Sequence, residues 1–554
     1  MRVIRPLRSG LALLVLSSSI AIRANAQEIP ASVEVQQGLV YSTVDGQSLL
    51  LDLFRPRDAL NPVPGIILIH GGRPATRDRQ HYRRLAVDLA ARGLVAATID
   101  YRGFEAASYP AALNDARAAV DWMNQNAERY GILRGAVAAG GEFFGGYVAA
   151  MLGVGVNGSR PAVGAVVGIQ PVLDLSRFEP VGNPPYPYEF HLFLGYPRAQ
   201  RPDLWEQLSP LHHVNARSSP FLLAHVEGHR VPIEQSRGMI AALSGHHVSA
   251  ELISPDASGT QLVNAPHEAP GLPRAIVNFV TASLWKPPEG VRMIGDVVYA
   301  RPEGREVRLD LFLPAPARGP VPAVLVFHGG GWTWGGKTDF REQCVHLARN
   351  GFAAACVEYR LARERIYPAA LDDAKAAVRW TRANAARFGI DPNRIVAMGM
   401  SAGGHLAAML GVTPEKAYFE RGDDNAGVSA RVSAVVAIAA VVDVPGFDRL
   451  DPWSARIFMG GRPQEAPARW ADASPTNHVG PNAAPFLFLH ATDDGDVAYG
   501  EAADMQKKLA RTGIRAELFT ADSGGHTFFR DYPWRVIAMQ RVVTFLRSVV
   551  GPTE

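Results

Sequence analysis

The sequence predicts an α/β protein made of two similar domains, each with a mostly parallel β-sheet covered by helices on both faces. The first observation is length, because 554 residues exceed what one hydrophobic core usually supports. The second is an internal repeat, in which the second half matches the first at an offset of 258 residues, as Leu309 matches Leu51. The third is a series of short apolar runs separated by helical patterns, which is typical of a parallel sheet buried on both faces.

The repeat sets the predicted domain boundaries. We expect one domain over residues 30–285, a linker over 286–291 that contains proline and glycine, and a second domain over 292–550. A repeat of this length suits a whole α/β domain and is too long for a solenoid unit. The matched segments are Leu51–Phe54 with Leu309–Phe312, His70–Gly72 with His328–Gly330, Tyr101–Arg102 with Tyr359–Arg360, Tyr109–Pro110 with Tyr367–Pro368, and Asp115 with Asp373.

The first 26 residues have the pattern of an export signal. A basic start is followed by a short apolar run and by Ala24-Asn25-Ala26, which fits a cleavage site. We therefore expect a periplasmic or extracellular protein with no membrane association once the signal is removed. A net charge of +3 is too small to indicate a nucleic acid or an anionic membrane as a partner. Export would permit a disulfide between the two cysteines, Cys344 and Cys356, but we expect two buried thiols.

Apolar runs in the second copy predict the strands of its sheet. A helix is expected between two of them, because Leu371, Ala374 and Val378 recur on one helical face. A last strand is expected near Leu518. The other predicted strands are Ala323–Phe327, Phe352–Val357, Ile395–Met398, Ala434–Ala440 and Pro485–Leu489.

The segment Gly399–Gly403 has the sequence Gly-Met-Ser-Ala-Gly and lies between a predicted strand and a helix-compatible run, His405–Leu410. A Gly-x-Ser-x-Gly pattern alone occurs by chance, but on a strand-to-helix turn it is typical of a nucleophile elbow. The glycines permit the sharp turn, and the serine lies at a helix N-terminus, where developing negative charge is favoured. The sequence therefore predicts Ser401 as a nucleophile.

A glycine-rich segment, His328–Trp332, follows the strand that ends at Phe327. A simple glycine turn would also have this sequence. With the elbow downstream, the backbone N–H groups of Gly329 and Gly330 are predicted to form an oxyanion hole with that of Ala402. Trp332 is expected to line the substrate pocket.

These motifs together resemble the α/β-hydrolase esterases that carry His-Gly-Gly-Gly, which include hormone-sensitive-lipase-like enzymes and bacterial acetyl- and feruloyl-esterase-like carboxylesterases. The resemblance covers about residues 292–550 and adds Tyr359–Leu361 and Tyr367–Ala370 to the elbow and the glycine loop. It implies two tandem α/β-hydrolase domains and a catalytic triad in the order serine, acid, histidine. It also implies chemistry without a metal or an organic cofactor.

The resemblance selects Asp494 as the acid, because the family places this residue four positions after a histidine, here His490. Asp493 and Asp496 are nearby alternatives that are more typical of a turn and of a solvent-facing position. Three aspartates suggest calcium as well, but the ligand spacing of a known calcium loop is absent.

His526 is predicted as the general base. It lies in a glycine-rich loop after the last strand and follows the other two members of the triad, as the family order requires. His405 is a rival, but it is expected to pack on the helix after the elbow. In the predicted mechanism His526 takes the proton of Ser401, Asp494 orients the imidazole ring, and water later cleaves an acyl-enzyme.

The first copy is predicted to be a degenerate hydrolase without activity. Proline in its glycine loop has no N–H to donate. Glu142, His229 and His267 are candidates for an unrelated site, but they lack the spacing of metal ligands. The altered positions are Phe143 for the serine, His229 for the acid, Thr260 for the histidine, and Arg73-Pro74 for Gly331-Trp332.

These features predict an exported serine carboxylesterase that hydrolyses a small or carbohydrate-linked acyl ester of the acetyl or feruloyl type. The segment Thr413–Asn425, present only in the second copy, is a candidate cap over the pocket. The first copy is expected to contact the second, where it would shield the active face or bind an extended substrate. Lipase-like or peptidase-like hydrolysis and a non-catalytic glycan-binding scaffold are the alternatives.

Overall fold

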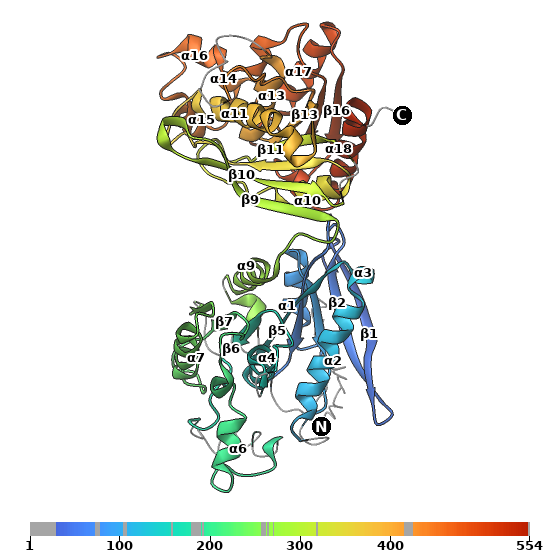
Figure 1. Cartoon of the computed structure of the whole chain (residues 1–554), viewed down its shortest axis with the longest axis vertical. Coiled ribbons are helices and arrows are strands. Elements are labelled where there is room, and N and C mark those ends of the chain that lie inside the picture. The colour runs from blue at the N-terminus through green and yellow to red at the C-terminus, as the bar shows by residue number, and fades with distance from the viewer. Residues whose placement is uncertain are drawn as a thin grey trace, which may run out of the picture.

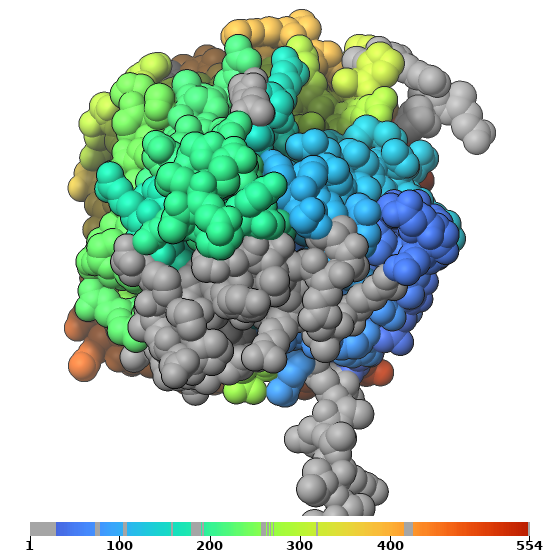
Figure 2. Space-filling view, turned by 90° about the horizontal axis from the view of Figure 1, so that it is seen from below, coloured from blue at the N-terminus to red at the C-terminus, as the bar shows by residue number. Residues whose placement is uncertain are grey.

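The computed structural model describes residues 29–71, 78–103, 108–156, 159–178, 190, 193–255, 262, 265–269, 271–316, 319–414 and 425–551. The predicted signal segment, Thr260, Arg73-Pro74 and most of the candidate cap lie outside the described residues. The two copies lie end to end along the long axis of the molecule (Figure 1). Seen from the end formed by the first copy, only the margins of the second remain in view (Figure 2).

Each copy builds its own eight-stranded sheet, and the two sheets have the same strand order, β1-β2-β4-β3-β5-β6-β7-β8 and β9-β10-β12-β11-β13-β14-β15-β16. In the first sheet β2 pairs antiparallel with both β1 and β4, and in the second β10 pairs antiparallel with both β9 and β12. All other neighbouring strands are parallel. The predicted fold class is therefore confirmed. The strands of the first copy are β1 Val33–Val44, β2 Gln47–Pro56, β3 Val63–Ile69, β4 Val95–Ile99, β5 Ile132–Glu142, β6 Val166–Ile169, β7 Phe221–Ala224 and β8 Ala250–Ile253. Those of the second are β9 Val291–Ala300, β10 Val307–Pro314, β11 Val321–Phe327, β12 Ala353–Val357, β13 Ile390–Met400, β14 Ala434–Ile438, β15 Phe486–Ala491 and β16 Ala516–Ala521.

Helices connect the parallel strands and cover both faces of each sheet, as crossover connections require. The helices of the first copy are α1 Arg83–Ala91, α2 Ala111–Gln125, α3 Ala127–Tyr130, α4 Phe143–Val154, α6 Pro202–Gln207, α7 Glu234–Gly245 and α9 Leu272–Leu284, with 3₁₀ turns η2 Pro210–His213 and η3 Pro266–Glu268. Those of the second are α10 Arg341–Arg349, α11 Ala369–Ala383, α12 Ala385–Phe388, α13 Ala402–Val412, α14 Val444–Phe447, α15 Pro452–Met459, α16 Pro467–Asp472, α17 Tyr499–Arg511 and α18 Trp534–Val550, with 3₁₀ turns η4 Pro302–Gly304, η6 Pro475–His478 and η7 Phe528–Arg530. No helix among these is long and apolar enough to cross a membrane.

The residues that match between the copies make the same contacts in both. In the second copy the Tyr359 hydroxyl donates to the His328 carbonyl oxygen at 2.8 Å, and the two rings stack with centroids 4.2 Å apart. In the first copy Tyr101 donates to the His70 carbonyl oxygen at 2.8 Å and stacks on His70 at 4.5 Å. These contacts fix the start of the glycine loop in each copy, so the matched histidines serve the fold.

A buried ion pair accounts for two further matched positions. Arg360 and Asp373 form a two-pronged contact, with an Arg360 Nη2–Asp373 Oδ1 distance of 2.8 Å, and both residues are buried. Arg102 and Asp115 repeat the contact in the first copy, also at 2.8 Å. Paired geometry of this kind offsets the cost of removing both charges from water.

A short segment after β2 joins the first copy to the second. The N–H of Leu60 donates to Glu342 Oε1 at 3.2 Å, and the Asn61 side-chain amide donates to the Glu342 carbonyl oxygen at 2.8 Å. Asp58 Oδ2 lies 3.5 Å from Arg535 Nε. The Leu60 side chain belongs to the hydrophobic core of the second copy and is buried there. The two copies therefore share packed and polar contacts.

The prediction of two buried thiols is wrong. Cys344 on α10 and Cys356 on β12 form a disulfide with a Cα–Cα distance of 6.5 Å. They are 12 positions apart in sequence, and α10 packs on the face of the sheet to which the side chain of Cys356 points. The geometry that joins them depends on this packing and not on the spacing of the cysteines in sequence.

Candidate active site

Ser401 lies at a strained turn between β13 and α13. Its backbone has φ +55° and ψ −120°, a conformation that residues with a Cβ rarely adopt. The Ser401 N–H donates to the Ile438 carbonyl oxygen at 2.8 Å, and its own carbonyl oxygen accepts from the His405 N–H at 2.9 Å. These two bonds hold the turn between the neighbouring strand and the helix.

The glycines around Ser401 are required by close backbone approach. A Cβ on Gly399 would lie 2.2 Å from the Gly403 carbonyl oxygen, and a Cβ on Gly403 would lie 2.1 Å from the Phe327 carbonyl oxygen. On Gly404 a Cβ would lie 2.7 Å from the Ala440 Cβ. Such distances exclude a side chain at each position, so the motif is set by the packing of α13 against β11 and β14.

The glycine loop after β11 lies directly against this turn. A Cβ on Gly329 would lie 3.2 Å from the Met400 carbonyl oxygen and 3.4 Å from the Ser401 Cβ. Gly330 has φ +108°, and a Cβ there would lie 2.2 Å from the Trp334 carbonyl oxygen. Gly329 and Gly330 line the same cavity as Ser401, and Ala402 is the buried first residue of α13. The structure thus brings together the three residues predicted to donate N–H groups.

Trp332 does not line the cavity, and this prediction is wrong. Its side chain is fully buried and stacks on Phe458 of α15 with ring centroids 4.0 Å apart. A positive φ of +56° turns it inward. Trp334, two residues later and 64% exposed, lines the cavity instead. The direction of a side chain in a loop depends on backbone angles that the motif does not encode.

Asp494 follows β15, and its buried carboxylate accepts several hydrogen bonds. His526 Nδ1 lies 2.9 Å and His490 Nε2 3.0 Å from Asp494 Oδ2, while the N–H groups of Asp496 and Val497 donate to Oδ1 at 2.9 Å each. Burial by itself would raise the pKa of Asp494. Hydrogen bonds from His490 and His526 outweigh burial and hold this pKa well below its ordinary range. The carboxylate is therefore charged at neutral pH.

His526 lies in the loop before η7, with its ring between Asp494 and the cavity that Ser401 lines. Asp493 holds this loop, because its carboxylate accepts the N–H groups of Gly524 at 3.1 Å and Gly525 at 2.8 Å. Sequence reasoning assigned Asp493 to a turn and missed this positioning role. The adjacent aspartates thus face different partners, one the imidazole and the other the loop that carries it.

His490 is a second residue whose role sequence reasoning did not assign. Its Nε2 contacts both the Asp494 carboxylate and the Val497 carbonyl oxygen, each at 3.0 Å. In the first copy His225 contacts the Val231 carbonyl oxygen at 2.8 Å. His225 directly follows β7, the strand that corresponds to β15, so a histidine at this strand end in both copies was the available signal.

The cavity at Ser401 has a volume of about 400 Å³. Met400, Trp334, Phe447 and Leu450 supply its apolar walls, and Trp334 and Leu450 are exposed at its rim. Its polar lining consists of Asp339, Asp451, Ser454, Asp496, Thr527 and Arg530. A ligand with a small apolar group next to a polar group would fit this lining.

His405 lies away from the cavity. It is fully buried, its Nε2 lies 2.7 Å from the Ala473 carbonyl oxygen, and its ring meets Trp332 edge-on. Burial lowers the pKa of His405 to about 4. Within the described part of the chain, no three His, Cys, Asp or Glu side chains are grouped so as to hold a metal ion.

The three residues of the first copy that are candidates for an unrelated site have separate surroundings. Glu142 is buried at the end of β5 and pairs with His81 at 2.8 Å, and burial raises its pKa. His267 Nε2 lies 3.3 Å from Glu268. Burial, with the charges of His225 and Arg230, lowers the pKa of His229 to about 4. Glu142, His229 and His267 therefore do not form one site.

Phe143 occupies the turn that Ser401 occupies in the second copy, and it keeps a positive φ of +44°. A Cβ on Gly145 would lie 1.9 Å from the Ile69 carbonyl oxygen, the same approach that Gly403 makes to Phe327. The Phe143 ring is buried and packs edge-on against Phe190. The first copy thus retains the strained turn but places an apolar ring where the second has a hydroxyl.

Glu501 on α17 holds the segment that follows β14. Its Oε2 accepts the N–H groups of Val442 at 2.8 Å and Asp443 at 3.0 Å. Burial raises the pKa of Glu501 to about 7, more than these two bonds lower it. Because the pKa of Glu501 is higher in the folded chain than in the unfolded chain, protonation of Glu501 stabilises the folded state. This contribution to the free energy of unfolding is full below about pH 4.5 and is lost as the pH rises through about 7.

Glu501→Gln is expected to remove this pH dependence, since glutamine accepts the same hydrogen bonds and does not ionise. The difference in melting temperature, wild type minus variant, should fall by about 4–8 °C between pH 5 and pH 8, which corresponds to a loss of about 2 kcal/mol in the free energy of unfolding. Differential scanning fluorimetry measures both melting temperatures. Asp504→Asn, on the same helix with a side chain 80% exposed, is the control and should show a constant difference. A constant difference for Glu501→Gln would contradict the assignment.

The fold and the site define the chain as a tandem α/β-hydrolase, with Ser401 and His526 lining one cavity of the second copy and Asp494 hydrogen-bonded to the imidazole. The chain belongs to the BD-FAE family, which matches residues 51–243 and 309–509, one match in each copy. The predicted tandem resemblance is therefore confirmed.

The curated relatives are similar to part of the chain. Probable carboxylic ester hydrolase LipM of Mycobacterium tuberculosis is 29% identical over 255 residues, which cover 41% of this chain and 58% of LipM. Esterase LipC of the same organism is 31% identical over 196 residues, which cover 34% of this chain and 48% of LipC. The chain thus spans about half the length of these relatives.

Solved structures match one half of the chain each. Thermogutta terrifontis esterase 2 phosphoramylated by tabun is 27% identical, covers 49% of this chain and 100% of its own, and has a TM-score of 0.42. An acetyl ester-xyloside bifunctional hydrolase from Caldicellulosiruptor lactoaceticus is 25% identical, covers 48% of this chain and 98% of its own, and has a TM-score of 0.43.

Proposed function

We propose that the second copy is an exported serine carboxylesterase that hydrolyses small acyl esters, of the acetyl or feruloyl type, on a carbohydrate. The observation that carries the proposal is that Ser401 and His526 line one cavity while Asp494 holds the far side of the imidazole. Membership of the BD-FAE family and the ester hydrolase names of the curated relatives support the same reaction class.

The mechanism follows from the positions of these groups. His526 Nε2 accepts the proton of the Ser401 hydroxyl as its oxygen attacks the ester carbonyl. The charged Asp494 carboxylate keeps the proton of His526 on Nδ1 and stabilises the imidazolium that forms. N–H groups of Gly329, Gly330 and Ala402 stabilise the oxyanion. The alcohol leaves with the proton from His526, and water then cleaves the acyl-enzyme by the reverse sequence.

The cavity supports a short acyl group. Its volume of about 400 Å³ is at the small end of the range for ligand sites, about 300–1,000 Å³. Trp334, Phe447 and Leu450 supply an apolar wall, while Asp451 and Asp496 lie on the polar side. A long acyl chain would have to bury its methylene groups against these carboxylates.

A panel of p-nitrophenyl esters tests the proposal. We expect kcat/KM to be highest for acetate or butyrate and to fall at least about a hundredfold at palmitate, because a long chain exceeds the apolar wall and meets the carboxylates of Asp451 and Asp496. Methyl ferulate tests the aromatic acyl group. A fluorophosphonate probe should label Ser401 alone, as identified by peptide mass spectrometry. Highest activity on palmitate, or labelling elsewhere, would overturn the assignment.

The first copy is proposed to be inactive. Phe143 at its elbow has no hydroxyl, and His229 stands at the position that corresponds to the acid. Export is proposed from the N-terminal signal pattern, and the disulfide between Cys344 and Cys356 is consistent with an oxidising compartment.

A further inference from the structure

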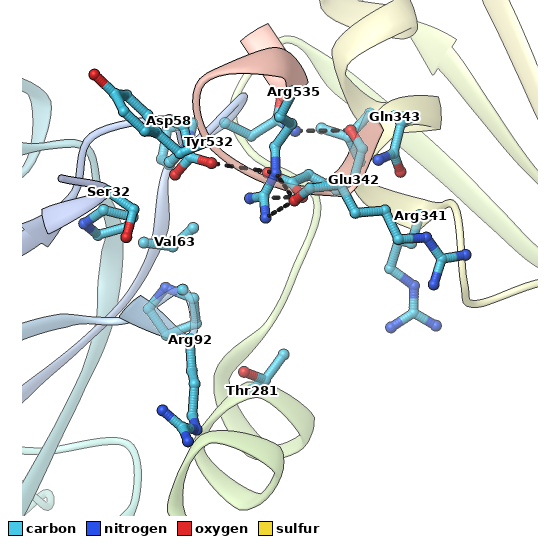
Figure 3. A pocket seen from close by; sticks show the side chains of 18 of the residues that line it. Ser32, Asp58, Val63, Arg92, Thr281, Arg341, Glu342, Gln343, Tyr532 and Arg535 are labelled. Carbon is cyan, nitrogen blue, oxygen red and sulfur yellow. Dashed lines mark hydrogen bonds and ion pairs between the residues drawn. The ribbon is translucent and has the colours of Figure 1, made fainter. Parts of the chain in front are cut away.

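A large cavity lies between the two copies (Figure 3). Its volume is about 690 Å³, and residues of both copies form its walls. Ser32, Arg92 and Thr281 line it from the first copy, and Glu342 and Arg535 line it from the second. This volume is well within the range of ligand sites. Neither copy alone would enclose it.

The cavity adjoins the active site. Asp339 and Arg530 line both this cavity and the one that contains Ser401. The segment from His526 runs through η7 to Arg535, so the chain that carries the imidazole continues into the wall between the copies. The two cavities are therefore neighbours, with Asp339 and Arg530 at their boundary.

The charges of the lining favour a neutral polar ligand. Four acidic and four basic side chains line the cavity, and several are already paired, as Arg535 is with Asp58 and Glu342. Equal numbers of acidic and basic side chains favour neither an anion nor a cation. A polyhydroxylated ligand meets both donors and acceptors here.

Aromatic side chains complete the lining. Trp285 is partly buried, with the Arg341 guanidinium 4.5 Å from its ring centroid, and Tyr532 is 40% exposed. Both line the cavity. Such rings offer flat apolar surfaces with a polar edge, which suit the C–H faces of a sugar ring.

We propose that the cavity between the copies is a carbohydrate subsite that holds the alcohol part of the ester while its acyl group lies at Ser401. This inference rests on the proposed function and gives the inactive copy a role, since it supplies half of the subsite. The acyl-bearing oxygen lies at the junction near Arg530, and the rest of the oligosaccharide lies between the copies.

Binding of unacetylated oligosaccharides tests the subsite without catalysis. Isothermal titration of the full-length protein with xylotetraose, cellotetraose and mannotetraose is expected to show binding of at least one. Thr281→Trp, which fills the cavity, should weaken that binding about tenfold or more. Ala282→Trp, at the next and exposed residue of α9, is the matched control and should bind within about twofold of the wild type.

Catalytic specificity gives the second measurement. The ratio of kcat/KM on an acetylated oligosaccharide to kcat/KM on p-nitrophenyl acetate should fall about tenfold in Thr281→Trp and stay unchanged in Ala282→Trp. Ester hydrolysis without oligosaccharide binding, or equal binding by the wild type and Thr281→Trp, would overturn the subsite alone. Oligosaccharide binding without any ester hydrolysis would overturn the proposed function and leave the carbohydrate site.

Discussion

Ser401→Ala is expected to lower the turnover of p-nitrophenyl acetate by a factor on the order of 10⁶, which leaves only hydrolysis near background. The proposed mechanism gives its first covalent step to this hydroxyl, and in the part of the cavity that the structure describes Ser454 and Thr527 are the other hydroxyl-bearing residues. Neither lies at the N-terminus of α13 against the glycine loop. Alanine keeps the Cβ of serine, so the strain of the turn at φ +55° is unchanged and the fold should be retained.

The measurement is steady-state hydrolysis together with fluorophosphonate labelling, and the melting temperature verifies folding. Phe143→Ala, at the corresponding turn of the first copy, is the matched control. It removes a buried ring and should lower the free energy of unfolding of that copy by about 3–5 kcal/mol. At temperatures below the unfolding transition, ester turnover should be unchanged. Substantial hydrolysis by folded Ser401→Ala protein would place the nucleophile elsewhere.

Asp494→Asn should lower turnover about 10⁴-fold. The Asp494 carboxylate accepts a hydrogen bond from Nδ1–H of His526 at 2.9 Å, which leaves Nε2 free to accept the serine proton. An asparagine amide can present an N–H group toward Nδ1 instead. The imidazole would then carry its proton on Nε2, and it could no longer act as a base toward Ser401.

Asp496→Asn is the control for Asp494→Asn. Asp496 is exposed at the cavity and lies two residues away, and its substitution should change turnover less than about fivefold. Because Asp494 also accepts from Val497 and His490, the melting temperature of its variant must be measured, and activity is compared well below it. Equal losses in the two variants would show that Asp494 has no special role.

Much of the fold was predictable because burial on both faces leaves a strong signal in sequence. Continuous apolar runs predicted β11, β12, β13, β14 and β15, and their bounds agree to within a few residues with those observed. The helical face of Leu371, Ala374 and Val378 lies in α11. Gly399 and Gly403 could be read from sequence because a side chain at either would overlap the backbone of a neighbouring element.

Other features had no local signal. The inward turn of Trp332 depends on a positive φ and on the presence of Phe458 more than 120 residues later. Asp493 and Asp494 are adjacent and chemically identical, and only the approach of the loop around His526 separates their partners. Such choices depend on where distant segments meet.

The sequence by itself determined the duplication, five central strands of the second copy and the glycines of the turn at Ser401, because burial on both faces and close backbone approach leave patterns in short segments. The tertiary structure alone decided the disulfide, the residue that lines the cavity at Ser401, and the chamber between the copies. These depend on contacts between elements far apart in the chain. The docking of Leu60 and Asn61 onto α10 is an example, since no pattern within either copy records the surface that it meets.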